Sequence, residues 1–245
     1  MKIISICSGI SLLIILNFTG IAASATFNNT EINDLKSMIG KKPENVSFWD
    51  VLRGPINSQF GDAIHSKLIS YLQKSNDIYR DGDYIVTSGY ESCERGHNEA
   101  IITVNQSNGT VEIAFFDKGK PNYVSDGNVK SNVVESWIKR SKLQIKNYKY
   151  KSKDKINSGS IRVAILDNNK YEFCLNSTHR GNSGQLEFIK SINSDGSVYY
   201  SKKDEYDDCS IKMVVKSQSI NVSQEKGVCG AGMGVTYDGQ YKLVH

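Results

Sequence analysis

Residues 83–116 read DYIVTSGYESCERGHNEAIITVNQSNGTVEIAFF, and this stretch decides the fold of the first half of the chain. It contains three runs rich in β-branched and aromatic residues, at 83–90, 99–105 and 110–116. Between the last two runs, residues 107–109 (Ser-Asn-Gly) form a hairpin signal, because Asn and Gly tolerate positive φ. We therefore expect an antiparallel sheet here.

Helical periodicity flanks this sheet on both sides. Upstream, Ser47 and Asp50 resemble a capping box before a short helix, which Gly54-Pro55 should interrupt. An amphipathic helix of about four turns should follow, because apolar residues recur every four positions. Those residues are Phe60, Ile64, Leu68 and Leu72. A third helix is expected downstream of the sheet, at Val133, Val134, Trp137 and Ile138.

The N-terminus predicts export. Residues 1–25 combine Lys2, a largely apolar run and the A-x-A site Ala23-Ser24-Ala25, which is the pattern of a cleaved secretory signal. The alternative is a membrane anchor, since the apolar run is long enough to span a bilayer, but the A-x-A end favours cleavage. Residues 26–45 are polar, and we expect them to form a loose leader. The mature protein should be periplasmic or secreted, without a membrane span.

Four cysteines follow the signal, and an even number in an exported chain indicates disulfides. They are Cys93, Cys174, Cys209 and Cys229. Of the three pairings that four cysteines allow, the one with Cys209–Cys229 is the most plausible, because adjacent strands are expected between these two residues. Cys93–Cys174 would then link the two halves. Zinc is the alternative, but no C-x-x-C pair or paired-histidine spacing is present. We expect no metal and no cofactor.

The second half predicts an all-β module, because short β-rich runs alternate with Asn-, Asp- and Gly-containing turns. The runs lie at 160–166, 170–174, 185–191, 197–201, 210–216, 219–223 and 235–244. The fold class is therefore α+β, with a helix-flanked antiparallel sheet followed by a small all-β sandwich or barrel. We place the α+β domain at 46–145 and the all-β domain at 156–245.

Between the halves, residues 139–155 carry eight Lys or Arg and a single acidic residue, Asp154. Such a run is typical of a linker or a solvated strand edge, and its functional alternative is contact with an anionic polymer. The formal charge falls from +4 to +3 when Lys2 leaves with the signal. That balance is too weak to indicate a nucleic-acid partner.

Two histidine loops are the first candidate site. Arg95 and His97 lie in a polar loop beside Cys93, and His179 follows Cys174 in a second loop. If these cysteines pair, the loops approach each other and could form an acid–base cluster or a binding finger. Two exposed, tolerant loops are the more ordinary interpretation. His65 is expected on the surface of its helix. Glu94 and Glu99 lack the apolar surroundings that a glycosidase acid requires.

Two further segments lie near the end of the chain. Residues 204–208 form the one concentrated acidic patch, which could steer a basic partner but lacks the spacing of a calcium loop. The candidate residues there are Asp204, Glu205, Asp207 and Asp208. Residues 227–234 are glycine-rich and contain Cys229, which predicts a tight, disulfide-pinned turn before the last strand.

The motifs then show a resemblance. The pre-sheet helix, Ser88-Gly89-Tyr90-Glu91-Ser92-Cys93, the hairpin into 111–114 and a helix at Trp137 resemble the periplasmic inhibitors of vertebrate lysozyme, over roughly residues 47–140. The second half is similar to the c-type lysozyme inhibitor family. It shares Cys209-Ser210-Ile211-Lys212-Met213, Cys229-Gly230 and Asp238-Gly239-Gln240-Tyr241.

The resemblance implies a non-enzymatic protein that binds a lysozyme or another cell-wall hydrolase, as an inhibitor or immunity protein. In the first family a histidine on a loop closed by two cysteines plugs the enzyme cleft, so His97 with Arg95 would be the plug. Asn98-Glu99 stands where the second cysteine should be, and the loop is not closed on itself. The alternatives are a secreted hydrolase or virulence factor acting on glycans, and a structural envelope protein that binds anionic polymers.

Overall fold

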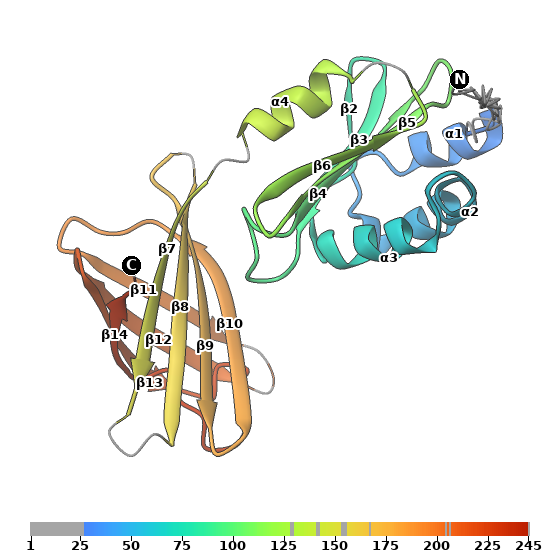
Figure 1. The fold of residues 1–245 in the computed structure, drawn as a ribbon. Coiled ribbons are helices and arrows are strands. Elements are labelled where there is room, and N and C mark those ends of the chain that lie inside the picture. The colour runs from blue at the N-terminus through green and yellow to red at the C-terminus, as the bar shows by residue number, and fades with distance from the viewer. Residues whose placement is uncertain are drawn as a thin grey trace, which may run out of the picture.

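A computed structural model of the chain describes residues 27–127, 130–140, 143–152, 156–166, 168–203, 205 and 207–244. It confirms the α+β class, with a helix-flanked antiparallel sheet followed by a second, nearly closed antiparallel sheet (Figure 1). We call residues 27–140 the N-terminal unit and residues 143–244 the barrel. The predicted signal at 1–25 lies outside the described residues. Within them, no helix has the length and apolar character needed to cross a bilayer.

The sheet of the N-terminal unit contains the three predicted strands and the predicted hairpin. Its main path runs β1-β3-β4-β5-β6, and β2 also pairs with β3. The turn closes where the Asn105 amide donates to the Thr110 carbonyl at 2.8 Å. The strands are β1 (Lys74–Ser75), β2 (Tyr79–Asp81), β3 (Tyr84–Tyr90), β4 (Glu99–Asn105), β5 (Val111–Asp117) and β6 (Lys120–Ser125).

Helices cover both faces of this sheet, so its central strands are buried on both sides (Figure 1). On one face the first three helices enclose the main core, and on the other the fourth packs over a smaller cluster that includes Val134 and Ile101. The helices are α1 (Asn29–Ser37), α2 (Phe48–Phe60), α3 (Asp62–Tyr71) and α4 (Asn132–Arg140), with a 3₁₀ turn at Pro43–Asn45.

The expected interruption at Gly54-Pro55 is wrong, because α2 continues through Pro55. An interior proline costs a helix about 3 kcal/mol. Leu52 and Ile56 are fully buried on either side of it, and such burial contributes about 1.5–3 kcal/mol for each side chain. The break falls instead at Gly61, whose φ of +84° ends α2 before α3 begins. Ser47 makes no side-chain capping bond, so the expected capping box is absent there.

The expected loose leader at 26–45 is also wrong over its described part. Asn28 and Glu31 form a capping box that starts α1, in which each side chain bonds the other residue's backbone. Ile32 and Leu35 on that helix are buried in the main core. The Phe27 amide donates to the Gly109 carbonyl at 3.0 Å, which ties the start of the described chain to the β4–β5 hairpin.

The second sheet confirms all seven predicted β runs and adds an eighth strand. Its order is β10-β9-β8-β7-β14-β13-β12-β11, and contacts between β10 and β11 nearly close it into a barrel. The strands are β7 (Gln144–Lys151), β8 (Asn157–Ile165), β9 (Tyr171–His179), β10 (Asn182–Lys190), β11 (Ser197–Lys203), β12 (Asp208–Val215), β13 (Ser219–Lys226) and β14 (Gly239–Leu243).

The added strand, β7, corrects the interpretation of residues 139–155. It lies inside the sheet, paired with both β8 and β14, and is neither a linker nor an edge. Tyr148 and Tyr150 face the barrel core, whereas Lys149 and Lys151 are exposed. A domain boundary at 145 would therefore cut this strand near its start, and the barrel begins before residue 156.

Both predicted disulfides are present. Cys209 and Cys229 join the start of β12 to the loop after β13, with Cα atoms 4.8 Å apart. Cys93 and Cys174 join the N-terminal unit to β9, with Cα atoms 5.4 Å apart. Disulfides persist in oxidising environments, so the presence of two disulfides is consistent with an extracellular or envelope compartment.

Candidate binding loops

The loop at 91–98, which carries Arg95 and His97, forms the contact between the two units and is not a free finger. Besides the Cys93–Cys174 disulfide, the Ser92 hydroxyl and the Cys93 amide both donate to the Glu187 carboxylate of β10, at 2.7 and 3.1 Å. The glycine at position 96 has a φ of +83°, and a Cβ there would lie 3.0 Å from Ile145 of β7. The loop is therefore held against the barrel wall.

Arg95 is the centre of a buried charge cluster at this contact. Its Nε atom lies 2.5 Å from Oε2 of Glu172, a residue whose side chain is 1 % exposed. Its guanidinium stacks over the Tyr90 ring, 3.8 Å from the centroid. Arg162 donates to the Arg95 carbonyl from the barrel side. Burial raises the pKa of Glu172, and the charge of Arg95 opposes that rise.

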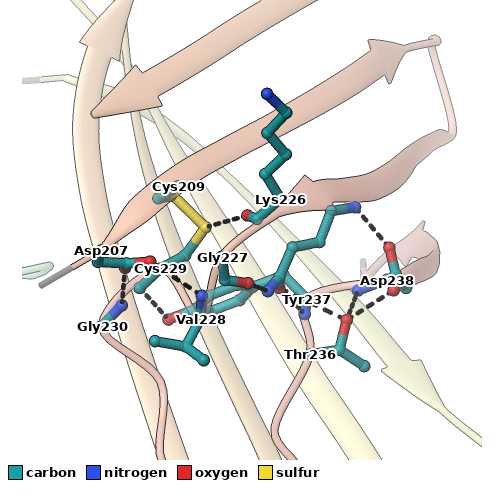
Figure 2. Close-up of a disulfide and its surroundings, with 11 residues drawn as sticks. Asp207, Cys209, Lys226, Gly227, Val228, Cys229, Gly230, Thr236, Tyr237 and Asp238 are labelled. Atoms are coloured by element: carbon teal, nitrogen blue, oxygen red, sulfur yellow. Dashed lines mark hydrogen bonds between the residues drawn. A yellow bond between two sulfur atoms is a disulfide. The ribbon is translucent and has the colours of Figure 1, made fainter. Parts of the chain in front are cut away.

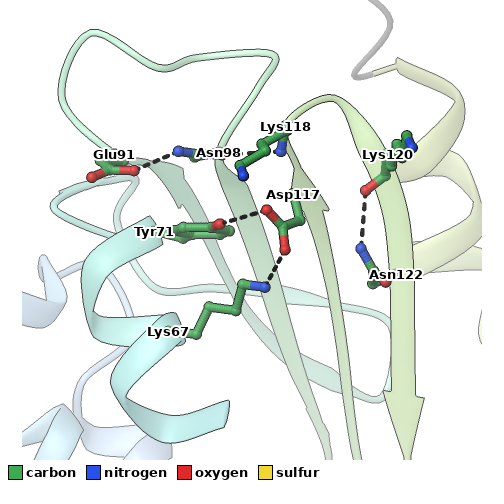
Figure 3. A network of polar contacts seen from close by, with 8 residues as sticks. All are labelled: Lys67, Tyr71, Glu91, Asn98, Asp117, Lys118, Lys120 and Asn122. Carbon is green, nitrogen blue, oxygen red and sulfur yellow. Dashed lines mark hydrogen bonds and ion pairs between the residues drawn. The ribbon is translucent and has the colours of Figure 1, made fainter. Parts of the chain in front are cut away.

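The same loop is also tied to the N-terminal sheet (Figure 3). Asn98 donates to Glu91 at 2.7 Å and accepts from the Lys118 amide at 3.1 Å. Close by, Asp117 accepts from Lys67 at 2.5 Å and from the Tyr71 hydroxyl at 3.2 Å (Figure 3). The hydrogen bond from Lys67 lowers the pKa of the Asp117 carboxyl.

The acid–base cluster of His97 and His179, which was the alternative to two ordinary exposed loops, does not form. His97 is half exposed and lies 3.6 Å from Glu94, whereas His179 is the last residue of β9 and bonds Asn157 at 2.5 Å. Five residues of extended strand separate His179 from Cys174, or about 17 Å at the usual rise. The disulfide therefore brings His97, but not His179, to the contact between the units. His65, expected on the surface, is 8 % exposed and buried.

The loop at 227–234, which we call the disulfide loop, is held by the Cys209–Cys229 bond and by several hydrogen bonds (Figure 2). Asp207 holds its first turn, because its carboxylate accepts from the Val228 and Gly230 amides at 3.0 and 3.2 Å. Positive φ angles at Gly227 and Gly230, of +68° and +72°, turn these amides toward one anion. A Cβ on Gly227 would lie 2.3 Å from the Asp207 carboxylate, so only glycine fits there.

The rest of the disulfide loop is fixed from the barrel core and from β10. The Tyr237 hydroxyl donates to the Cys229 carbonyl at 3.4 Å, and burial raises the pKa of this tyrosine to about 12, so the donor stays protonated. On the other side, the Gly232 amide donates to the Ser183 carbonyl at 3.0 Å. The Asn182 side chain donates to the Met233 carbonyl at 2.9 Å. The backbone is therefore constrained from one end of the loop to the other.

Two apolar side chains on this rigid loop face solvent. Met233 is 88 % exposed and Val228 is 54 % exposed, the two highest values among the large hydrophobic residues of the described chain. A hollow of about 480 Å³ adjoins Val228, bordered by Gln185, Leu186 and Tyr200. Exposed apolar side chains on a fixed backbone beside a hollow offer anchors for a protein partner, although single exposed apolar residues are also common on monomers.

The predicted acidic patch lies next to the disulfide loop, although not all of it is free. Glu205 and Asp208 are exposed, whereas the Asp207 carboxylate holds the loop amides. Asp204 lies outside the described residues. The patch therefore contributes two exposed charges among the described residues. The carboxylate of Asp207 has a structural role that the sequence pattern did not reveal. No group of three potential metal ligands occurs among the described residues.

A scan of protein-family models, of curated proteins and of solved structures finds no match to this chain. The fold and the two loops are therefore the basis for any functional conclusion. Sequence reasoning singled out the 227–234 segment as a pinned turn but missed its exposed tips. The signal was present in the sequence, because Val228 and Met233 are large apolar residues placed among glycines in a turn.

Proposed function

We propose that this chain is an exported binding protein that inhibits, or gives immunity to, a peptidoglycan-cleaving enzyme such as a lysozyme. The observation that carries the proposal is the rigid disulfide loop with Val228 and Met233 at its surface. The 91–98 loop is the weaker candidate, because its Arg95 is engaged between the units. In this proposal the disulfide loop enters the enzyme's cleft.

Rigidity favours this use of the loop. A flexible segment loses conformational entropy when it binds, at about 0.5–1.5 kcal/mol for each immobilised side chain and more for the backbone. The disulfide, the Asp207 carboxylate and the Tyr237 hydroxyl already constrain this backbone. Burying Met233 against a partner would contribute up to about 1.5–3 kcal/mol, and Val228, which is 54 % exposed, about half as much.

Charge supports the same partner class. Lysozymes of animals are generally basic, and the mature chain is itself slightly basic, so attraction must come from a local acidic surface. Exposed Glu205 and Asp208 are the residues that would supply this attraction, and Lys203 of β11, directly opposite Asp208, offsets part of it. Complementary charges of this kind raise the association rate and fix orientation more than they add affinity.

Localisation to the periplasm or the exterior is part of the proposal. It is supported by the signal pattern at 1–25 together with two disulfides that close within and between the units. A periplasmic or secreted inhibitor would meet wall-cleaving enzymes in that compartment.

The test is a turbidity assay of c-, g- and i-type lysozymes on a cell-wall suspension, with the purified oxidised chain from residue 26. We expect inhibition of at least one enzyme, and at least a tenfold weaker inhibition with Val228→Asp/Met233→Asp. The matched control is Ile69→Asp/Ile189→Asp, which changes two exposed apolar residues elsewhere and should inhibit like the wild type. His97→Ala should also retain inhibition.

Other outcomes refute the proposal in distinguishable ways. Inhibition lost in His97→Ala but kept in the disulfide-loop variant would return the site to the 91–98 loop. Inhibition of none of the three enzymes would reject the lysozyme target. Clearing of the wall suspension by the chain alone would show a hydrolase.

A further inference from the structure

A long trough crosses the outer face of the barrel, away from the disulfide loop. Its main part has a volume of about 580 Å³ and lies over β7, β8 and β9. A second hollow continues it toward the 91–98 loop, and a third continues it over β14. Lys149 lines all three, so the three hollows adjoin one another at this side chain.

The register of the strands explains the depression. Residues directly opposite in paired strands point to the same side of a sheet, and Lys149, Ser160 and Asn176 are opposite one another on β7, β8 and β9. Two residues further along β7, on the same face of the sheet, Lys151 is opposite Ser158 of β8. The middle strand therefore carries short serines between the longer side chains of its neighbours, and this difference in length makes the floor of the trough.

Basic residues outnumber acidic ones on this face, where Glu94 at the edge of the second hollow is the one carboxylate among the lining residues. Lys149 of β7 is directly opposite Lys242 of β14, and like charges in that position are destabilising. Lys151 lies two residues further along the same face of β7. All three lysines are exposed, and none makes an ion pair within 4 Å among the described residues. The arrangement costs stability in the free protein, and an anion in the trough would offset that cost.

We propose that this trough binds a strand of acidic polysaccharide. The three lysines meet its carboxylate or phosphate groups, and Asn147, Asn176 and Gln240, which line the trough and its extensions, supply donors and acceptors for sugar hydroxyls. Proteins bind single-stranded nucleic acid by stacking its bases on exposed aromatic rings. The trough offers no such ring among its described lining residues, so a glycan is favoured over a nucleic acid. The lining tyrosines, Tyr148 and Tyr150, pack into the barrel core instead.

The test measures fluorescence anisotropy of a labelled oligogalacturonate on titration with the oxidised chain from residue 26. Neutral dextran and a dT oligonucleotide of similar length serve as comparison probes. We expect oligogalacturonate to bind with an affinity that falls steeply with salt, and dextran and dT to bind at least tenfold more weakly. Lys149→Gln/Lys151→Gln/Lys242→Gln should weaken oligogalacturonate binding at least tenfold.

Two further variants separate the trough from general charge. Lys190→Gln/Lys203→Gln/Lys216→Gln removes the same charge from exposed positions outside the trough and should bind like the wild type. Ser160→Phe fills the floor without changing charge and should weaken binding at least fivefold. The proposal is overturned if the wild type does not bind oligogalacturonate or binds dT more tightly. It is also overturned if both triple lysine variants weaken binding equally, or if Ser160→Phe binds normally. Lysozyme inhibition by the trough variants should be unchanged, because none of these residues belongs to the disulfide loop.

Discussion

Replacing Arg95 with Met should destabilise the protein in a way that depends on pH. The substitution removes the charge partner of Glu172, whose side chain is 1 % exposed and whose second oxygen has no hydrogen-bond partner. Breaking a buried pair by removing one member costs about 3–5 kcal/mol, because the remaining charge is buried without compensation. Arg162 stays nearby and compensates in part, so we expect a loss of about 3 kcal/mol at pH 8.

The sign of the pH dependence follows from Glu172. Burial already raises its pKa in the folded protein, and loss of Arg95 would raise this pKa further. A protonated carboxyl needs no ionic partner, so the penalty should be smallest in acid. It should grow by up to about 1.4 kcal/mol per pH unit between the two folded pKa values. We expect the loss at pH 5 to be smaller by at least 1 kcal/mol than at pH 8.

Urea unfolding at pH 5 and pH 8 measures this loss. Both tryptophans, Trp49 and Trp137, lie in the N-terminal unit, so their fluorescence follows that unit, while far-UV circular dichroism follows the whole chain. With a denaturant slope of about 2 kcal/mol/M, a loss of 3 kcal/mol shifts the midpoint by about 1.5 M. Lys139→Met, which breaks only an exposed ion pair, should cost less than about 1 kcal/mol at both pH values. A pH-independent loss for Arg95→Met, or one no larger than this control, would refute the reasoning.

Two other perturbations test single contacts. The hydrogen bond from Lys67 holds the pKa of Asp117 below its ordinary value, so this carboxylate stabilises the fold above its unfolded pKa and ceases to do so as pH falls through its folded pKa. Asp117→Asn should therefore lower the melting temperature at pH 7 and leave it nearly unchanged at pH 2, as measured by thermal unfolding. An equal drop in melting temperature at both pH values would contradict this. Gly227→Ala should lower the free energy of unfolding, measured with urea, by at least 1 kcal/mol more than Gly181→Ala does. Both positions have positive φ, but only at Gly227 would a Cβ lie 2.3 Å from Asp207. Equal losses would show that a small shift relieves this contact.

Local patterning was enough to predict most strands of this fold. Strands alternate or concentrate apolar residues over a few positions, and their turns contain Asn, Asp or Gly, so each signal is local. Strand β7 was predicted only as a linker or a solvated strand edge, because its lysines hid the alternation of Tyr148 and Tyr150 with Lys149 and Lys151. Helix α1 was missed because only Ile32 and Leu35 mark its buried face, although Asn28 and Glu31 already had capping-box spacing.

The candidate sites were less predictable because they depend on contacts between distant residues. Arg95 and Glu172 are separated by 77 positions, and no local pattern connects them. The expectation of a free finger at His97 followed from a resemblance in sequence, whereas the position of the loop is set by the barrel beside it. Likewise, the lysine at 242 joins the trough only through the register of β14 with β7.

The bond between Cys93 and Cys174 also makes the protein a closed covalent ring over the intervening segment. The ring spans a sequence separation of 81 and includes the single stretch of backbone that leads from one unit to the other. A protease that cuts once between residues 94 and 173 therefore leaves both halves attached. They come apart only when a reductant acts as well. In a medium rich in proteases, a first cut within this segment leaves the molecule in one piece.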